Sequence, residues 1–263
     1  MNSTEGTSAI RLLKEYAQGR RDFEGWDLEG AKLKGANLRE ANLAKSNLRR
    51  ANLTGTTLFE ANLTGVNLSQ ANLEGADLSE ALLPWANLFG ANLQEANLQK
   101  AYLRGTDFSK ANLRRANCLD CLLEDALFIE ADLTEVSLVK ASLAKSNLWG
   151  AQLTNANLEN TNLTKSILRE ANLFQSNLKR ADLWYAELQG ADLEKMDLSL
   201  ADFHWATLQG ANLTSANLYL ATLQEVDLGG ANLSKANLNQ AVFYKTILRE
   251  VILMEEIHME LEP

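Results

Sequence analysis

The chain has 263 residues, of which 46% are hydrophobic, 22% are charged and only 7% are aromatic, and its net charge is −9. This acidic balance argues against a direct nucleic-acid binder, which carries a basic excess. Two cysteines are too few for a disulfide framework and indicate a reducing compartment, and no apolar run is long enough for a transmembrane helix. The composition therefore predicts a soluble, cytoplasmic protein without a membrane or nucleic-acid partner.

The first segment, residues 1–20, is predicted to be an N-terminal capping helix for the region that follows. A helix is expected over residues 8–18, because Ser8 can cap its start and Gly19 can end it. We expect it to cover the beginning of the next region, with Trp26 as a large apolar plug. The residues expected on its apolar face are Ile10, Leu13, Tyr16 and Ala17.

Between residues 21 and 255 the chain repeats a five-residue pattern of a small residue, Asn or Asp, Leu and two variable residues. We call the Leu the central position and the Asn or Asp before it the ladder position. Central positions recur every five residues from Phe23 to Leu253, 47 times without an insertion. The unbroken phase predicts one domain without an internal linker.

A period of five fits neither an α-helix nor a continuous strand, because the leucines would scatter around the helix or alternate between strand faces. The small residue and the Leu are two apart, so both can point inward from a short extended segment that ends in a turn. Four such units close a square coil of 20 residues. Stacked about 4.8 Å apart, the units would make about 12 coils around a solid core of Leu and Ala. The recurring Asn side chains are predicted to bond to turn backbone or to each other as a structural ladder.

Units such as ANLRE from Ala36 and ANLTG from Ala51 resemble the repeats of the pentapeptide-repeat protein family. The resemblance covers residues 21–255. It implies an all-β fold, a right-handed quadrilateral parallel β-helix, of the kind formed by long, uninterrupted cyanobacterial members.

The last eight residues, 256–263, are predicted to be a short acidic C-terminal cap or tail. Met254, Ile257 and Leu261 would share one face of a helix. This segment either covers the last coil or pairs with a second copy of itself. The chain is therefore predicted to be a monomer, or a homodimer through its C-terminal end.

The sequence offers no catalytic, metal-binding or cofactor-binding constellation, because the repeat directs apolar side chains inward. His204 and His258 are too few and too separate for a hydrolase or a metal site, so we predict that the protein is not an enzyme. Cys118 and Cys121 stand at a central and a small position. Both should be buried thiols, with a strained disulfide between them as the alternative.

Outward-facing aromatic residues are concentrated on one side of the predicted coils. A spacing of 20 residues should place Tyr185 beside Trp205 and Trp184 beside His204, with Lys165 positioned for a cation–π contact with Tyr185. These rings either reinforce the stacking of coils or form a protein-docking patch, since such residues dominate interfaces. The candidate partner-binding residues are Trp184, Tyr185, His204, Trp205, Leu200, Leu220, Tyr219, Trp85 and Tyr102.

Two functions are compatible with these features. The first is a rigid, non-catalytic scaffold or regulator that binds a partner protein through its surface. The alternative, implied by the resemblance to some acidic members of the family, is a DNA mimic that binds DNA gyrase or topoisomerase. A mimic should carry one continuous acidic stripe, whereas here Lys and Arg are interleaved with Asp and Glu on all four faces. We therefore favour the scaffold.

Overall fold

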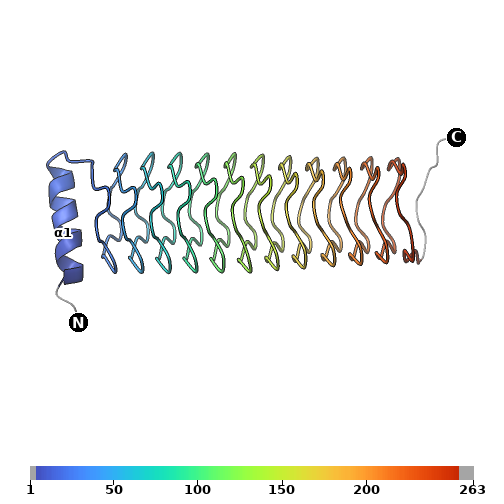
Figure 1. Cartoon of the computed structure of the whole chain (residues 1–263), viewed down its shortest axis with the longest axis horizontal. Coiled ribbons are helices and arrows are strands. Elements are labelled where there is room, and N and C mark those ends of the chain that lie inside the picture. The colour runs from blue at the N-terminus through green and yellow to red at the C-terminus, as the bar shows by residue number, and fades with distance from the viewer. Residues whose placement is uncertain (1–3, 255–263) are drawn as a thin grey trace.

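The computed structural model describes residues 4–254 as one helix followed by an uninterrupted rod (Figure 1). The helix, α1, spans Thr4–Ala17 and lies across the N-terminal end of the rod. In the rod, each ladder residue pairs in parallel with the residue 20 positions later, from Asp22 with Asn42 to Asn232 with Ile252. Among the described residues these bridges are isolated, so no strand is longer than one bridging residue. The predicted pairing of residues one coil apart is confirmed.

The interior of the rod is a continuous apolar shaft. Every central side chain from Phe23 to Leu238 is buried, as are most of the small residues two positions earlier. Burying one Leu side chain stabilises the fold by about 1.5–3 kcal/mol, and each coil buries four central side chains. At the C-terminal end Leu248 and Leu253 are exposed, because no further coil covers them among the described residues. The predicted acidic cap at 256–263 lies outside those residues, so the choice between monomer and C-terminal homodimer stays a prediction.

Each corner of the coil is a tight turn in which the second variable residue has a positive φ. At one corner the N–H of Ala31 donates to Leu28 O (3.0 Å), with Gly30 at φ 65° between them. Residues with side chains adopt the same conformation, as Glu40 does at φ 55°. This conformation costs about 1–2 kcal/mol for a non-glycine residue. The N–H of Glu40 donates to Phe59 O in the next coil (2.9 Å), and hydrogen bonds of this kind offset the strain.

Helix α1 faces the rod with a stripe that shares only Tyr16 with the predicted face. Ala9 and Leu12 are buried, whereas Ile10 is 69% exposed and Leu13 is also exposed. The helix also begins at Thr4, so Ser8 is not its cap. The helix ends at Ala17, one residue earlier than predicted, and Gly19 follows it with a φ of 96°.

The sequence contains two apolar stripes on this helix, one through Ala9, Leu12 and Tyr16 and one through Ile10, Leu13 and Ala17. Both stripes have helical spacing, so only contact with the first coil distinguishes them. The contact is made by Tyr16, whose hydroxyl donates to Arg39 O (3.0 Å) and whose ring lies 6.5 Å from that of Phe23. Phe23 in turn packs edge-on against Trp26, with ring centroids 5.1 Å apart.

Cys118 and Cys121 are both buried, as predicted, and both are free thiols in the structure rather than a disulfide. The Cys121 thiol donates to Leu98 O (2.9 Å), which replaces the bond that a Ser or Thr makes at other small positions. A hydrogen bond with Cys121, together with burial, raises the pKa of Cys118 well above its usual value.

We expect neither thiol to react with an aromatic disulfide reagent in the native protein, because the thiolate is the nucleophile and both groups are shielded from solvent. Both should react after unfolding in denaturant. Colorimetric titration before and after unfolding measures this. Rapid reaction of a thiol in the native protein, or the loss of both thiols without a reductant, would contradict the buried, reduced pair.

Candidate functional site

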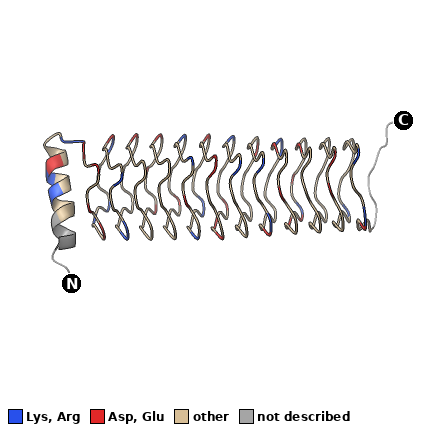
Figure 2. Cartoon of the chain, viewed as in Figure 1, with Lys and Arg blue, Asp and Glu red and all other residues tan. Residues whose placement is uncertain are grey.

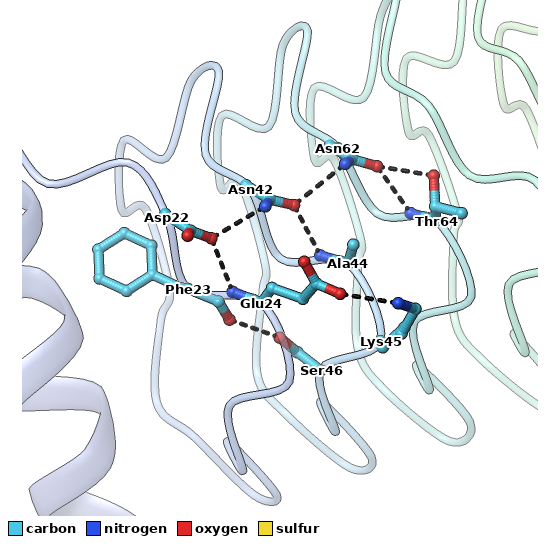
Figure 3. Close-up of polar contacts among 9 residues, drawn as sticks. All are labelled: Asp22, Phe23, Glu24, Asn42, Ala44, Lys45, Ser46, Asn62 and Thr64. Carbon is cyan, nitrogen blue, oxygen red and sulfur yellow. Dashed lines mark hydrogen bonds and ion pairs between the residues drawn. The ribbon is translucent and has the colours of Figure 1, made fainter.

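The ladder positions form hydrogen-bonded rows along the outside of the rod (Figure 3). The side-chain amide of Asn42 donates to Asp22 Oδ1 (2.9 Å), and that of Asn62 donates to Asn42 Oδ1 (3.0 Å). Asn42 Oδ1 also accepts from the backbone N–H of Ala44 (3.2 Å). The predicted structural ladder is confirmed. Its amides are occupied in joining coils, so this array is not an active site.

We call the side of the rod that carries ladder positions 22, 42, 62 and so on the first face, and the side that carries 27, 47, 67 and so on the second face. The corner between them holds the variable residues 24–25, 44–45 and every 20 residues thereafter, and we call it the aromatic edge. Its rings are Trp85, Trp184, Tyr185, His204, Trp205 and Tyr244. The coil therefore places rings from distant parts of the sequence on one line.

Four of these residues, Trp184, Tyr185, His204 and Trp205, form the ring cluster. Tyr185 stacks on Trp205 with centroids 5.0 Å apart and planes 11° apart. Trp184 lies 5.3 Å from His204 and 5.3 Å, edge-on, from Trp205. The ammonium of Lys165 lies 5.7 Å from the Tyr185 ring centroid. All three contacts expected from the sequence are confirmed.

Polar partners hold the nitrogen atoms of the cluster. Trp184 Nε1 donates to Asp202 Oδ2 (2.6 Å), and Trp205 Nε1 donates to Glu225 Oε2 (3.2 Å). Buried indole N–H groups need such partners. With the N–H groups satisfied from within the rod, the exposed surface of the two indoles is apolar and held in one orientation.

Both ring nitrogens of His204 face oxygen atoms: Nδ1 lies 2.5 Å from Asp202 Oδ1, and Nε2 lies 2.9 Å from Gln224 Oε1. Burial opposes protonation of the imidazole. Hydrogen bonds to Asp202 and Gln224 and the charges of Asp202 and Glu225 outweigh it and raise the pKa of His204.

We expect the protein to lose stability as the pH rises through the raised folded-state pKa of His204. Because the folded pKa exceeds the unfolded value of about 6.5, the contribution is complete below that value and is lost above the folded one. Thermal unfolding followed by tryptophan fluorescence at pH values on both sides of this interval measures the effect. The His204→Gln variant, which cannot titrate there, should show a smaller change. An equal change in both proteins would contradict the assignment.

The structure does not bring all nine candidate residues together. Leu200, Tyr219 and Leu220 are exposed on the opposite corner of the first face. Trp85, which is 62% exposed, lies on the aromatic edge but five coils before Tyr185, about 24 Å away at the spacing of stacked strands. Its ring occupies the space above Gly105, where a β-carbon would clash with the ring. Tyr102 stands at a ladder position of the first face in the following coil, so neither residue belongs to the ring cluster.

Sequence reasoning missed the acceptors Asp202, Gln224 and Glu225, and the exposed Leu82 and Leu122 on the first face. The acceptors of Trp184 Nε1, His204 Nε2 and Trp205 Nε1 lie 18–20 residues later in the sequence, so a comparison of residues about one coil apart could have found them. The two leucines stand at ladder positions. Their departure from Asn or Asp was the available signal.

Charges of both signs alternate along the rod (Figure 2). Arg115 forms ion pairs with Glu95 (3.6 Å) in the preceding coil and Glu135 (2.9 Å) in the following one. Such alternation leaves no continuous acidic stripe in the described coils, so the distribution does not favour the DNA mimic, which stays a prediction.

Within residues 4–254, no three His, Cys, Asp or Glu side chains are grouped so that they could hold a metal ion. The same stretch contains no helix that is both long and apolar enough to cross a bilayer.

Coils joined by parallel bridges around a leucine shaft define a β-solenoid repeat protein. The sequence model of pentapeptide repeats matches the chain in eight copies, at residues 22–58, 58–94, 86–117, 111–150, 121–160, 141–180, 176–215 and 216–253. The chain therefore belongs to the pentapeptide-repeat family. Members of this family fold as right-handed quadrilateral β-helices and are generally not enzymes.

Solved structures with similarity to this chain include HetL, a pentapeptide-repeat protein involved in heterocyst differentiation regulation from the cyanobacterium Nostoc sp. strain PCC 7120. HetL is 30% identical over 92% of both chains, with a TM-score of 0.29. Rfr23 from the cyanobacterium Cyanothece 51142 is 29% identical over 45% of this chain and 99% of its own, with a TM-score of 0.38. QnrB1, a plasmid-mediated fluoroquinolone resistance protein, is 17% identical over 83% of this chain and 93% of its own, with a TM-score of 0.33. A search of curated proteins finds no match.

Proposed function

We propose that this protein is a rigid, non-catalytic scaffold that binds a partner protein through its surface, with the ring cluster as the principal contact. The observation that carries the proposal is the ring cluster itself. Its two tryptophans are anchored by hydrogen bonds to Asp202 and Glu225. Trp184 and Tyr185 are exposed to solvent, and Trp205 is half-buried beside them. Trp and Tyr are the residues most enriched among interface hot spots.

The rod supports this function by fixing the rings before a partner arrives. Stacking of Tyr185 on Trp205 joins two coils, and Asp202 binds both Trp184 and His204. A preorganised contact loses little side-chain entropy on binding, which favours affinity. The long shaft behind the cluster serves as the support.

The Trp184→Ala, Trp205→Ala double variant tests the proposal by affinity capture from the source organism. Trp149→Ala is the matched control, because Trp149 and Trp184 are each 38% exposed but stand on different corners. We expect a protein that is retained by the wild type and by Trp149→Ala, and whose binding falls about 100-fold with the double variant, as for two hot-spot residues. Circular dichroism and the unfolding midpoint check that the variants fold. Equal retention of every captured protein by all three baits would reject the ring cluster as the docking surface.

A further inference from the structure

The polar ladder of the first face is interrupted in the middle of the rod. It runs from Asp22 through Asn42 to Asn62, as Figure 3 shows, and does not resume as Asn until Asn162. We call the interruption the ladder gap. The residues at its four ladder positions are Leu82, Tyr102, Leu122 and Ser142.

Interrupting the ladder leaves backbone donors without their usual acceptor. Elsewhere an Asn or Asp oxygen accepts the N–H two residues later, as Asn62 Oδ1 accepts from Thr64 (3.1 Å). In the ladder gap, the N–H groups of Arg104, Glu124 and Ala144 donate to no acceptor in the described part of the protein. The first position of the gap creates no such donor, because Leu82 is followed two residues later by a proline.

The three residues that carry these donors line one groove of about 390 Å³. The groove crosses three successive coils, so it runs along the rod. Leu122, which is 41% exposed, contributes apolar lining. The residues that line it are Tyr102, Arg104, Leu122, Glu124, Asp125, Ala144 and Lys145.

The groove is lined by two basic and two acidic side chains, so its net charge is zero. Arg104 Nε forms an ion pair with Asp125 Oδ2 (3.2 Å), which leaves one further acid, Glu124, and one further base, Lys145. A ligand with a net charge of either sign gains little from such a surface. Neutral oxygen acceptors satisfy the backbone donors without repulsion from the two acids.

We propose that the groove of the ladder gap docks an amphipathic helix of a partner protein that carries Gln or Asn carboxamides beside a Leu. The three donors are one coil apart, so they repeat about every 4.8 Å along the rod. Side chains at positions i, i+3 and i+7 of a helix rise by about 4.5 and 10.5 Å, close to one and two coils. The carboxamide oxygens then replace the missing ladder, and a Leu at i+4 packs on Tyr102 and Leu122.

This site adds a second protein contact to the function proposed above and does not depend on the ring cluster. A second row of three unpaired N–H groups, at Arg169, Gln189 and Gln209 on the second face, lacks the same apolar surroundings. There the Arg169 guanidinium binds Glu187 (2.7 Å) and Gln189 (3.2 Å), so polar side chains already cover the row.

The test uses two synthetic helical peptides on an alanine and lysine background, one with Gln at i, i+3 and i+7 and Leu at i+4, and one with those Gln residues replaced by Ala. Two-dimensional amide NMR of the full chain reports on the donors directly. We expect the Gln peptide to shift the amide resonances of Arg104, Glu124 and Ala144 downfield, and the Ala peptide to bind at least tenfold more weakly. Equal binding of the two peptides, shifts confined to other residues, or no binding of the Gln peptide would overturn the proposal.

A variant of the protein that restores an Asn at a ladder position of the gap complements the comparison of the two peptides. In Leu122→Asn the new carboxamide can accept the Glu124 N–H, so the affinity for the Gln peptide should fall at least tenfold. Thr207→Asn fills a ladder position on the second face and should leave peptide binding unchanged. The Trp184→Ala, Trp205→Ala double variant, which removes the ring cluster, should also leave peptide binding unchanged. Loss of peptide binding in the tryptophan variant, or full binding by Leu122→Asn, would contradict the assignment to the groove. Because these readouts do not use the ring cluster, failure here is distinguishable from failure of the proposed function.

Discussion

Replacing Phe128 with alanine is expected to lower the free energy of unfolding by about 3–5 kcal/mol, the usual cost of removing a buried aromatic ring. Phe128 and Phe108 are both buried and stack in successive coils, with ring centroids 5.0 Å apart and planes 4° apart. Each coil sends four central side chains into the shaft, and both neighbouring coils are held by backbone bridges. Collapse around the missing ring is therefore restricted, and a cavity remains.

The matched control is Phe128→Leu, because Leu is the residue at most central positions. It keeps an apolar side chain in the shaft and should cost less than about 1.5 kcal/mol, as volume-conserving core substitutions do. Urea unfolding followed by circular dichroism measures both values. If the alanine and leucine variants unfold at the same denaturant concentration, the ring stack is not part of a tightly packed shaft.

Replacing Leu12 with aspartate is expected to detach helix α1 from the end of the rod. Leu12 is fully buried against the first coil, and an unpaired carboxylate there costs about 3–5 kcal/mol. Because the helix can leave the rod, the protein escapes this cost by exposing the apolar first coil around Phe23 instead of unfolding. The exposed coil end presents unpaired backbone, which favours end-to-end association. We expect a loss of helical circular dichroism and a larger species by size-exclusion chromatography with light scattering.

The exposed stripe of the same helix provides the control. Ile10→Asp places the same charge two residues earlier, at a solvent-exposed position, and should leave both the helical signal and the mass unchanged. If the Ile10 variant dissociates the helix and the Leu12 variant does not, the orientation of α1 is wrong.

The repeat could be identified from the sequence because the five residues of each unit determine which side chains of that unit point inward. A small residue and a Leu two positions apart point inward wherever they occur, and the next unit repeats the geometry after a fixed turn. For the same reason the burial of Cys118 and Cys121 and the contact of Tyr185 with Trp205 followed from position number alone. In a solenoid with a fixed number of residues per coil, the difference between two residue numbers shows whether the residues are neighbours in successive coils.

Sequence alone therefore determined the period, the inward and outward sides and the alignment of rings along one edge. Tertiary structure decided which stripe of α1 meets the rod, because Leu12 and Leu13 are equally apolar and only contact with Phe23 and Trp26 separates them. It also decided how Asp202 orients Trp184 and how the N–H groups of the ladder gap open into a groove. These features depend on side-chain rotamers and on atoms about one coil apart, and the repeat pattern specifies backbone position but not rotamer.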